Sequence, residues 1–413
     1  MAGAFFPHHL EMSHSTGYDG SDMETEKMIR IGGLGPLSLP GIPWAGRELQ
    51  DGMALAVKQL NDSGGVLGRP LALLFEDTSG RPEAGVAAVE MLREEEVHAF
   101  AGEFHSVVAD AIIELVQRSG LPFVCASATL DAITARRLSC VFRLAPPQSY
   151  GWGIYADFLA SEGFQHVVAL QEDNLYWNSG SRAIEARLRK LGVQFTRLSV
   201  APGMGDAASW IQQVLAKQSK PPAPDILLLL MAYPEPLRSV VGEARAHGLG
   251  PPACFLGDPA GRAVFPDWWE IAGTDAVQVP FLSYSRPGHL TSQGKQMSPE
   301  FEKRYGRQPT FVALEGYDAI LVLAHAFEDA GTTEPTKIRD ALRRIELEGT
   351  RGTIRFSTEP TGVVHQQWRW PPVCVVAYSH ARQAFSEAGF LWDAEHGHAI
   401  ATKSLRTGRG GKS

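Results

Sequence analysis

The chain has 413 residues, of which 44% are hydrophobic, and carries a formal net charge of -8 at pH 7. A chain of this length exceeds one ordinary hydrophobic core, so we expect two domains. The modest negative charge and the lack of a sustained basic stripe argue against nucleic acid or an anionic membrane surface as a partner. The longest apolar run, 226–233, is far shorter than the roughly 20 residues that cross a bilayer.

The two ends of the chain differ in composition from the rest. Residues 1–27 are rich in Gly, Ser, His and acidic residues and lack a basic start followed by an apolar core. This pattern predicts a disordered leader and not a secretory signal. Residues 394–413, which end in the basic sequence LRTGRGGKS, are predicted to form a C-terminal tail.

The cysteines are scattered through apolar, strand-like segments without a Cys-x-x-Cys spacing. Isolated cysteines of this kind behave as small hydrophobic residues. We therefore expect free buried thiols, with no metal site and no redox pair. The four residues are Cys125, Cys140, Cys254 and Cys374.

Apolar strand patterns alternate with helical patterns from residue 28 onward. Alternation of this kind argues for a parallel sheet covered on both faces. The Ala-Pro-Pro segment at 145–147 then reads as a hinge or linker. In this first set, strands are predicted at 28–35, 71–76, 97–101, 121–125 and 140–144, and helices around 53–60 and at 82–95, 106–119 and 130–137.

A second set of the same rhythm follows the hinge. Its predicted strands are 167–171, 193–200, 226–231, 253–256 and 276–282, and its helices are 149–162, 176–191, 206–217 and 236–246. Three successive helices at 298–305, 311–330 and 335–345 are expected to return to the first lobe, and 349–356, 363–369 and 373–378 read as strands.

The predicted fold class is therefore α/β, with two doubly wound lobes. We assign 28–146 and 286–357 to lobe 1, and 147–285 and 358–393 to lobe 2. The chain then crosses between the lobes three times.

A buried strand is predicted to stop, and a helix to start, within residues 119–131. Ser127, Ala128 and Thr129 fill this gap, and such small residues leave backbone N–H groups open. In an open parallel sheet, ligands sit beyond the carboxyl ends of the strands, and a helix N-terminus favours a negative group. The passage predicts a seat for a carboxylate, or alternatively a helix capped by Ser127 or Thr129.

Several short passages, in their order and spacing, resemble the type I periplasmic solute-binding proteins of the branched-chain amino-acid (leucine/isoleucine/valine-binding) family. The resemblance spans nearly all of 28–392, and the order is more specific than any one passage. The passages are 35–38 (GPLS), 61–68 (NDSGGVLG), Gly102 with His105 and Ser106, 127–129 (SAT), Phe142 with Arg143, Tyr176, 244–249 (ARAHGL), 255–258 (FLGD), 305–309 (YGRQP), Tyr317 with Asp318, and 352–356 (GTIRF).

The resemblance implies two Rossmann-like lobes that close about a hinge on a small solute, which then passes to the permease subunits of an ABC importer in the membrane. It implies no catalysis and no cofactor. In similar proteins, the residues that match Ser106, Ser127, Ala128 and Thr129 hold the carboxylate and ammonium ends of an amino acid or related small carboxylate. Hydroxyl and N–H groups at strand ends suit a carboxylate that is buried on closure.

From the second lobe, the resemblance implies contacts by Tyr176, by Tyr233 and by Asp258, the last as the acid that meets the ligand's ammonium group. Pro259 directly follows Asp258, which departs from the family's local pattern. A turn or helix-start role is therefore the other reading of Asp258. If the acid is elsewhere, Glu172 and Glu235 are the remaining candidates.

Two tryptophans depart from the family pattern or add to it. Trp177 stands where the family usually has glycine, and Trp44 lies in the loop beyond the first strand. Each reads either as a lining of the site or as core packing. As site residues they favour an aromatic or bulky ligand.

Other functions fit parts of the sequence less well. A nicotinamide dehydrogenase needs its glycine fingerprint to turn directly into a helix, whereas prolines follow the glycines at 32–35. A serine hydrolase needs a G-x-S-x-G elbow, which is not present. A cytoplasmic sensor on the same fold is the main alternative, because no signal peptide is visible. The length of the resemblance favours a periplasmic transport protein.

Overall fold

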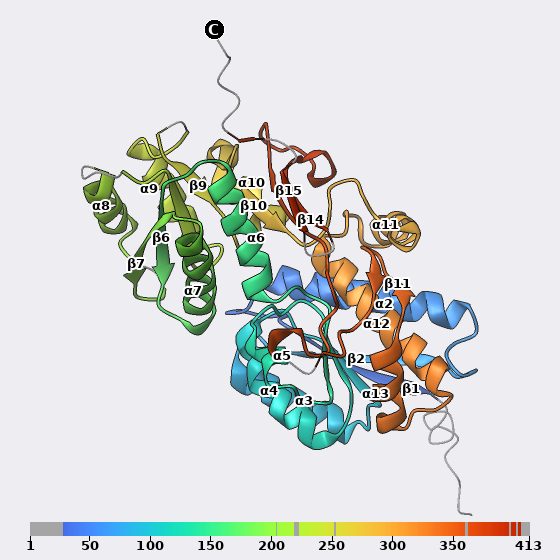
Figure 1. Cartoon of the computed structure of the whole chain (residues 1–413). Helices are drawn as coiled ribbons and strands as arrows, with labels where there is room; N and C mark the ends of the chain where they lie inside the picture. The colour runs from blue at the N-terminus through green and yellow to red at the C-terminus, as the bar shows by residue number, and fades with distance from the viewer. Residues whose placement is uncertain are drawn as a thin grey trace, which may run out of the picture.

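The computed structural model describes residues 28–203, 205–218, 223–251, 253–359, 362–395, 398–401 and 404–405. It shows two α/β lobes, with the first at the bottom and the second at the upper left of Figure 1. The predicted leader, 1–27, lies outside the described residues. Within those residues, no helix has both the length and the apolar composition that a membrane span needs.

The first lobe is built on a five-stranded parallel sheet with the order β2-β1-β3-β4-β5. Its side chains alternate between two faces, so that Phe123 packs among residues of α3 and α4 while Val124 packs toward α2 and α12. The strands are β1 (Ile29–Gly35), β2 (Leu71–Asp77), β3 (Ala99–Gly102), β4 (Phe123–Cys125) and β5 (Val141–Arg143). The helices are α2 (Pro43–Asp62), α3 (Pro82–Glu94), α4 (Ser106–Ser119), α5 (Ala132–Ala135), α12 (Phe311–Ala330) and α13 (Pro335–Arg344).

The second lobe repeats this plan and then departs from it. Four parallel strands have the order β7-β6-β8-β9, and a bridge between Asp258 and Phe281 extends the sheet into the antiparallel set β10-β13-β14-β15. The strands are β6 (His166–Glu172), β7 (Gln194–Val200), β8 (Ile226–Leu230), β9 (Phe255–Gly257), β10 (Phe281–Ser283), β13 (Val373–Ala377), β14 (Gly389–Glu395) and β15 (His398–Ala401). The helices are α6 (Gln148–Ser161), α7 (Leu175–Lys190), α8 (Ala207–Gln218), α9 (Leu237–Ala246) and α10 (Trp268–Ala272).

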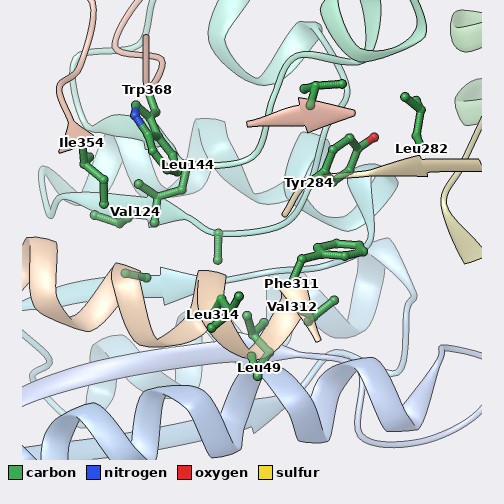
Figure 2. Close-up of a cluster of buried hydrophobic side chains, with 14 of the residues drawn as sticks. Leu49, Val124, Leu144, Leu282, Tyr284, Phe311, Val312, Leu314, Ile354 and Trp368 are labelled. Atoms are coloured by element: carbon green, nitrogen blue, oxygen red, sulfur yellow. The ribbon is translucent and has the colours of Figure 1, made fainter. Parts of the chain in front are cut away.

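Three connections carry the chain between the two sheets. The first leads from β5 to α6, the second from β10 to α11 (Ser292–Tyr305), and the third from β12 (Thr353–Ile354) to β13. The first and third run side by side, because Arg143 and Gln367 form a parallel bridge and Gln367 Nε2 donates to the Ala145 carbonyl at 2.8 Å. Figure 2 shows the apolar core beside them, where Tyr284 and Phe311 meet with ring centroids 5.2 Å apart.

Four sequence predictions differ from the structure. The strand predicted at 276–282 is confined to β10, and a 3-10 helix, η2 (Gly273–Ala276), precedes it. The strand at 349–356 is instead a hairpin of β11 (Leu347–Glu348) and β12. Residues 363–369 make only isolated bridges, because this stretch spans the third connection. The tail predicted from 394 onward is wrong at its start, since β14 runs to Glu395 and pairs with β15.

All four cysteines are buried and free, as the sequence predicts. Burial raises the pKa of the Cys125 and Cys254 thiols to about 12, so both stay protonated at neutral pH. No group of three or more His, Cys, Asp or Glu side chains in the described part of the chain is placed to hold a metal ion.

Candidate solute-binding site

The predicted seat lies at the carboxyl edge of the first-lobe sheet. Ser127, Ala128 and Thr129 directly follow β4, beside the end of β3, and all three are buried. Strand order 2-1-3-4-5 is a doubly wound order whose ligand crevice lies beyond this edge. The three residues therefore lie at the end of a buried strand, as the sequence predicts, and their role as a seat stays a prediction.

Two of the three backbone N–H groups of the seat have partners, contrary to the prediction that they are open, since Ser127 N donates to the Glu103 carbonyl at 3.2 Å and Thr129 N donates to Ser106. Ser106, at the start of α4, accepts hydrogen bonds at its Oγ from Thr129 N at 3.0 Å and Leu130 N at 3.2 Å. The short helix α5 begins only at Ala132, and the residue at its N-cap, Asp131, makes no side-chain capping bond. Because both lone pairs of the Ser106 hydroxyl are engaged, this hydroxyl can act toward a solute only as a donor.

A buried arginine holds the backbone of the seat in place by hydrogen bonds. The Arg143 side chain donates from Nη1 to the carbonyls of Thr129 at 3.1 Å and Leu130 at 2.6 Å, and from Nη2 to Thr134 Oγ1 at 2.9 Å. Burial lowers the pKa of Arg143 to about 10. This value is still well above neutral pH, so the side chain stays protonated there. A guanidinium cation thus lies directly behind the seat, and its field favours an anionic solute.

A network of buried charges reaches the seat from α12. Ser127 Oγ donates to Glu315 Oε2, and Arg351 Nη1 donates to Glu315 Oε1 at 3.0 Å. Arg351 Nε also lies 3.8 Å from Asp318 Oδ2. Burial raises the pKa of Glu315 to about 7 and of Asp318 to about 6, and in both cases the Arg351 charge opposes the rise. Two acids share one cation, so near neutral pH part of the network holds a proton.

We expect Glu315→Gln to become more stable relative to the wild type as the pH rises from about 5 to about 8. The folded-state pKa of Glu315 lies above its ordinary value of 4.5. The stability that this acid contributes is therefore present below about pH 4.5 and lost as the pH rises through about 7. One pKa unit corresponds to about 1.4 kcal/mol, so the relative gain should be about 1 to 3 kcal/mol.

Urea unfolding of both proteins at the two pH values measures this gain. The control is Glu90→Gln, whose carboxylate is 48% exposed on α3. A pH trend shared by both variants would not be specific to the buried acid. A free-energy difference for Glu315→Gln that does not change with pH would contradict the raised pKa.

Tyr176 brings the second lobe to the seat. It stands at the start of α7, and burial raises the pKa of its hydroxyl, a rise that interaction with the Thr129 side chain opposes. Thr129 Oγ1 is buried, and none of its contacts with the described residues meets both the distance and the angle of a hydrogen bond. The two side chains are therefore close, and Thr129 keeps a hydroxyl that a solute can use.

Trp177 belongs to the core more than to the seat. It is 7% exposed and packs beside Trp152, with ring centroids 6.2 Å apart. The guanidinium of Arg262 lies 5.3 Å from its ring centroid. The packing interpretation of Trp177 thus fits the structure, and its ring also supports an arginine that the sequence did not single out.

Asp258 is completely buried and is occupied by protein donors. Arg262 donates to Asp258 Oδ1 from Nε at 3.0 Å and from Nη2 at 2.8 Å, and the backbone N–H of Arg262 reaches Oδ2 at 2.6 Å. Ala260 N donates to Oδ1 at 3.2 Å. This is the geometry of the turn and helix-start reading, and it leaves little room for a ligand ammonium group.

The alternative acids are also engaged by the protein. Glu172 accepts from Gly203 N at 3.0 Å and Ala232 N at 2.8 Å. Glu235 accepts from Ser239 Oγ at 2.9 Å.

An aromatic contact joins the lobes at a second point. Trp44, at the start of α2, meets Phe265 of the second lobe edge to face, with ring centroids 4.2 Å apart. Phe265 in turn contacts Tyr233 at 5.1 Å, and the Tyr233 hydroxyl donates to Asp267. The predicted residues Trp44 and Tyr233 thus belong to one cluster through Phe265, which the sequence analysis missed.

Comparison with known proteins agrees with this geometry. Residues 28–370 match the model of a family described as periplasmic binding protein. The chain is 22% identical over 330 residues to a leucine-, isoleucine-, valine-, threonine- and alanine-binding protein of Pseudomonas aeruginosa, covering 79% of this chain and 85% of that protein. It also shares its fold with a leucine-binding protein of Thermotoga maritima, with a TM-score of 0.75, 22% identity and 88% and 97% of the two chains covered.

A third similar structure is a solute-binding protein of an ABC transporter from R. palustris in complex with benzoate, with a TM-score of 0.75, 16% identity and 91% and 98% coverage. The two lobes and three connections of this chain have the same fold as these structures. The chain belongs to the periplasmic binding protein family.

Proposed function

We propose that this protein binds a small carboxylate-bearing solute between its lobes and releases it to an ABC importer. The observation that carries this proposal is the pair of hydroxyls at the seat. Ser106 can only donate, and Thr129 Oγ1 is buried without a full hydrogen bond. A buried carboxylate needs such donors, and the Arg143 cation behind them adds to its stabilisation.

An amino acid is the first candidate solute, because the relatives bind leucine and similar amino acids. A carboxylate without an amine is the second, and one observation favours it. The ammonium group of a buried amino acid must meet an acceptor, but Asp258 is already paired with Arg262. The aromatic residues Tyr176, Tyr284 and Trp44 near the interface suit an aromatic carboxylate such as the benzoate bound by the R. palustris protein.

The partners proposed with this function are membrane permease subunits, and the proposed location is the periplasm. Membership of the periplasmic binding protein family supports both proposals. A cytoplasmic sensor with the same site would instead deliver its signal to a protein. Fractionation of the native cell separates these two assignments, since only a transport protein should be recovered with the periplasmic contents.

Calorimetric titration tests the solute class. The full chain is titrated with a panel of amino acids, with their deaminated analogues and with benzoate and its hydroxylated forms. We expect saturable binding by at least one carboxylate, and a change in tryptophan emission as the surroundings of the half-buried Trp44 change. No binding across the whole panel, or binding that does not need the carboxylate, would contradict the proposal.

A further inference from the structure

A pocket of about 580 Å³ opens on the connections between the lobes. It lies away from the seat, on the second and third connections, and we call it the hinge pocket. Arg286 comes from the second connection, Arg351 and Arg355 flank β12, the third connection supplies Trp368, Arg369 and Trp370, and β14 supplies Glu395. The residues that define the hinge pocket are Arg286, Arg351, Arg355, Trp368, Arg369 and Trp370.

The lining of the hinge pocket is rich in arginine. Four arginines line it, against one acid, Glu395. The carboxylates that pair with these arginines, which are Asp393, Glu315, Glu346 and Glu359, are not among its lining residues. Each guanidinium group is thus paired with a carboxylate outside the lining, and the lining itself presents four guanidinium groups and one carboxylate.

Arg351 has bonding capacity that the protein does not use. Its side chain is only 1% exposed. Its Nη1 donates to Glu315 and to the Tyr284 carbonyl, but Nε and Nη2 are buried and make no hydrogen bond with any described residue. A buried donor left without a partner is destabilising, and Arg351 is among the residues that line the pocket.

Two flat side chains complete the pocket. Arg351 stacks over Trp368 at 5.2 Å, and Arg369 stacks over Trp370 at 5.8 Å. Trp370 is 43% exposed and has a φ of 60°, a left-handed conformation that is rare for a bulky residue and is often found at functional sites. Stacking holds the two guanidinium planes in place before any ligand arrives, which reduces the entropy that binding loses.

From these observations we propose that the hinge pocket binds a multiply charged oxyanion, such as a phosphate or pyrophosphate group. Planar guanidinium groups match the geometry of such an anion. The site is connected to the seat, because Arg351 also holds Glu315, which accepts from Ser127. An anion bound there shares Arg351 with the acid that fixes the seat, so it acts on the hinge and not in place of the solute.

Calorimetry with inorganic pyrophosphate tests this site on the full chain at constant ionic strength, with inorganic phosphate as a second titrant and sodium chloride as the blank. We expect one saturable site with a Kd below about 1 mM, and weaker binding of phosphate because it carries less charge. No saturable heat from pyrophosphate would overturn the proposal.

The variant that localises the site is the double change Arg355→Gln with Arg369→Gln. Both side chains are more than half exposed, so the fold should tolerate their loss, unlike the loss of buried Arg351. Pyrophosphate should bind at least tenfold more weakly to this variant. The matched control is Arg189→Gln with Arg344→Gln, two exposed arginines outside the pocket, and it should bind like the wild type. Equal weakening in both variants would show general charge screening and refute the site.

Discussion

Replacing Arg262 by methionine is expected to lower the free energy of unfolding by about 3 to 5 kcal/mol, because it leaves the Asp258 carboxylate buried and without its counter-charge. Asp258 is 0% and Arg262 4% exposed. The same change also leaves the carbonyl of Met231, which accepts from Arg262 Nη1 at 2.5 Å, without that donor. Urea unfolding followed by circular dichroism measures the loss.

Two further variants show whether the loss of unfolding free energy comes from the buried ion pair. Arg238→Met removes an arginine that is 53% exposed on α9, and should change the free energy by no more than about 0.5 kcal/mol. Asp258→Asn combined with Arg262→Met removes both charges and should cost less than the sum of the two single changes. An Arg262→Met loss as small as that of Arg238→Met would mean that the pair is not buried as described.

The same pair decides between the two readings of Asp258. The Asp258 carboxylate already accepts hydrogen bonds from four protein N–H groups. Asp258→Asn should therefore lower the affinity for an amino acid and for its deaminated analogue to a similar extent. A loss confined to the amine-bearing ligand would instead make Asp258 the ammonium partner that the family resemblance implies.

The fold was largely predictable because its central strands are buried on both faces. Such strands read as short continuous apolar runs, as in 226–231, and the helices between them keep a period near 3.6. The predictions failed where the chain leaves these layers. The alternating stretch at 363–369 has a strand-like composition but crosses between lobes, and β14 pairs with β13 and β15 in an antiparallel set that lies outside the parallel layers.

The site was predictable only in its local part. The seat follows from residues next to one another, since small polar residues end a buried strand. The sequence indicated the roles of Glu315 and Arg351 less clearly. Glu315 contacts Ser127 and Arg351 only because α12 returns to the first lobe from a distant part of the chain. An acid within the apolar helical stretch 311–330 was the available sign, since a buried carboxylate in such a stretch needs a cation. Phe265 gave no sign at all.

Replacing Thr129 by valine is expected to lower the affinity for the tightest-binding solute of the calorimetric panel by about ten- to a hundredfold, while the free energy of unfolding stays unchanged. Valine has nearly the shape of threonine, and Thr129 Oγ1 makes no full hydrogen bond that the change would remove from the protein. A carboxylate that used this hydroxyl loses a charge-assisted hydrogen bond worth about 1.5 to 3 kcal/mol. Calorimetry gives the affinity and urea unfolding gives the stability.

Thr196→Val is the control, because it makes the same chemical change on β7, in the second lobe, where Thr196 Oγ1 contacts His166 Nε2 at 2.8 Å. Its solute affinity should equal that of the wild type. If Thr129→Val also binds normally, the hydroxyl of Thr129 does not touch the solute, and the solute must be held by other groups of the seat, such as the Ser106 hydroxyl. If Thr129→Val instead loses stability, the contact with Tyr176 is the more important one, and Thr129 joins the lobes without the solute.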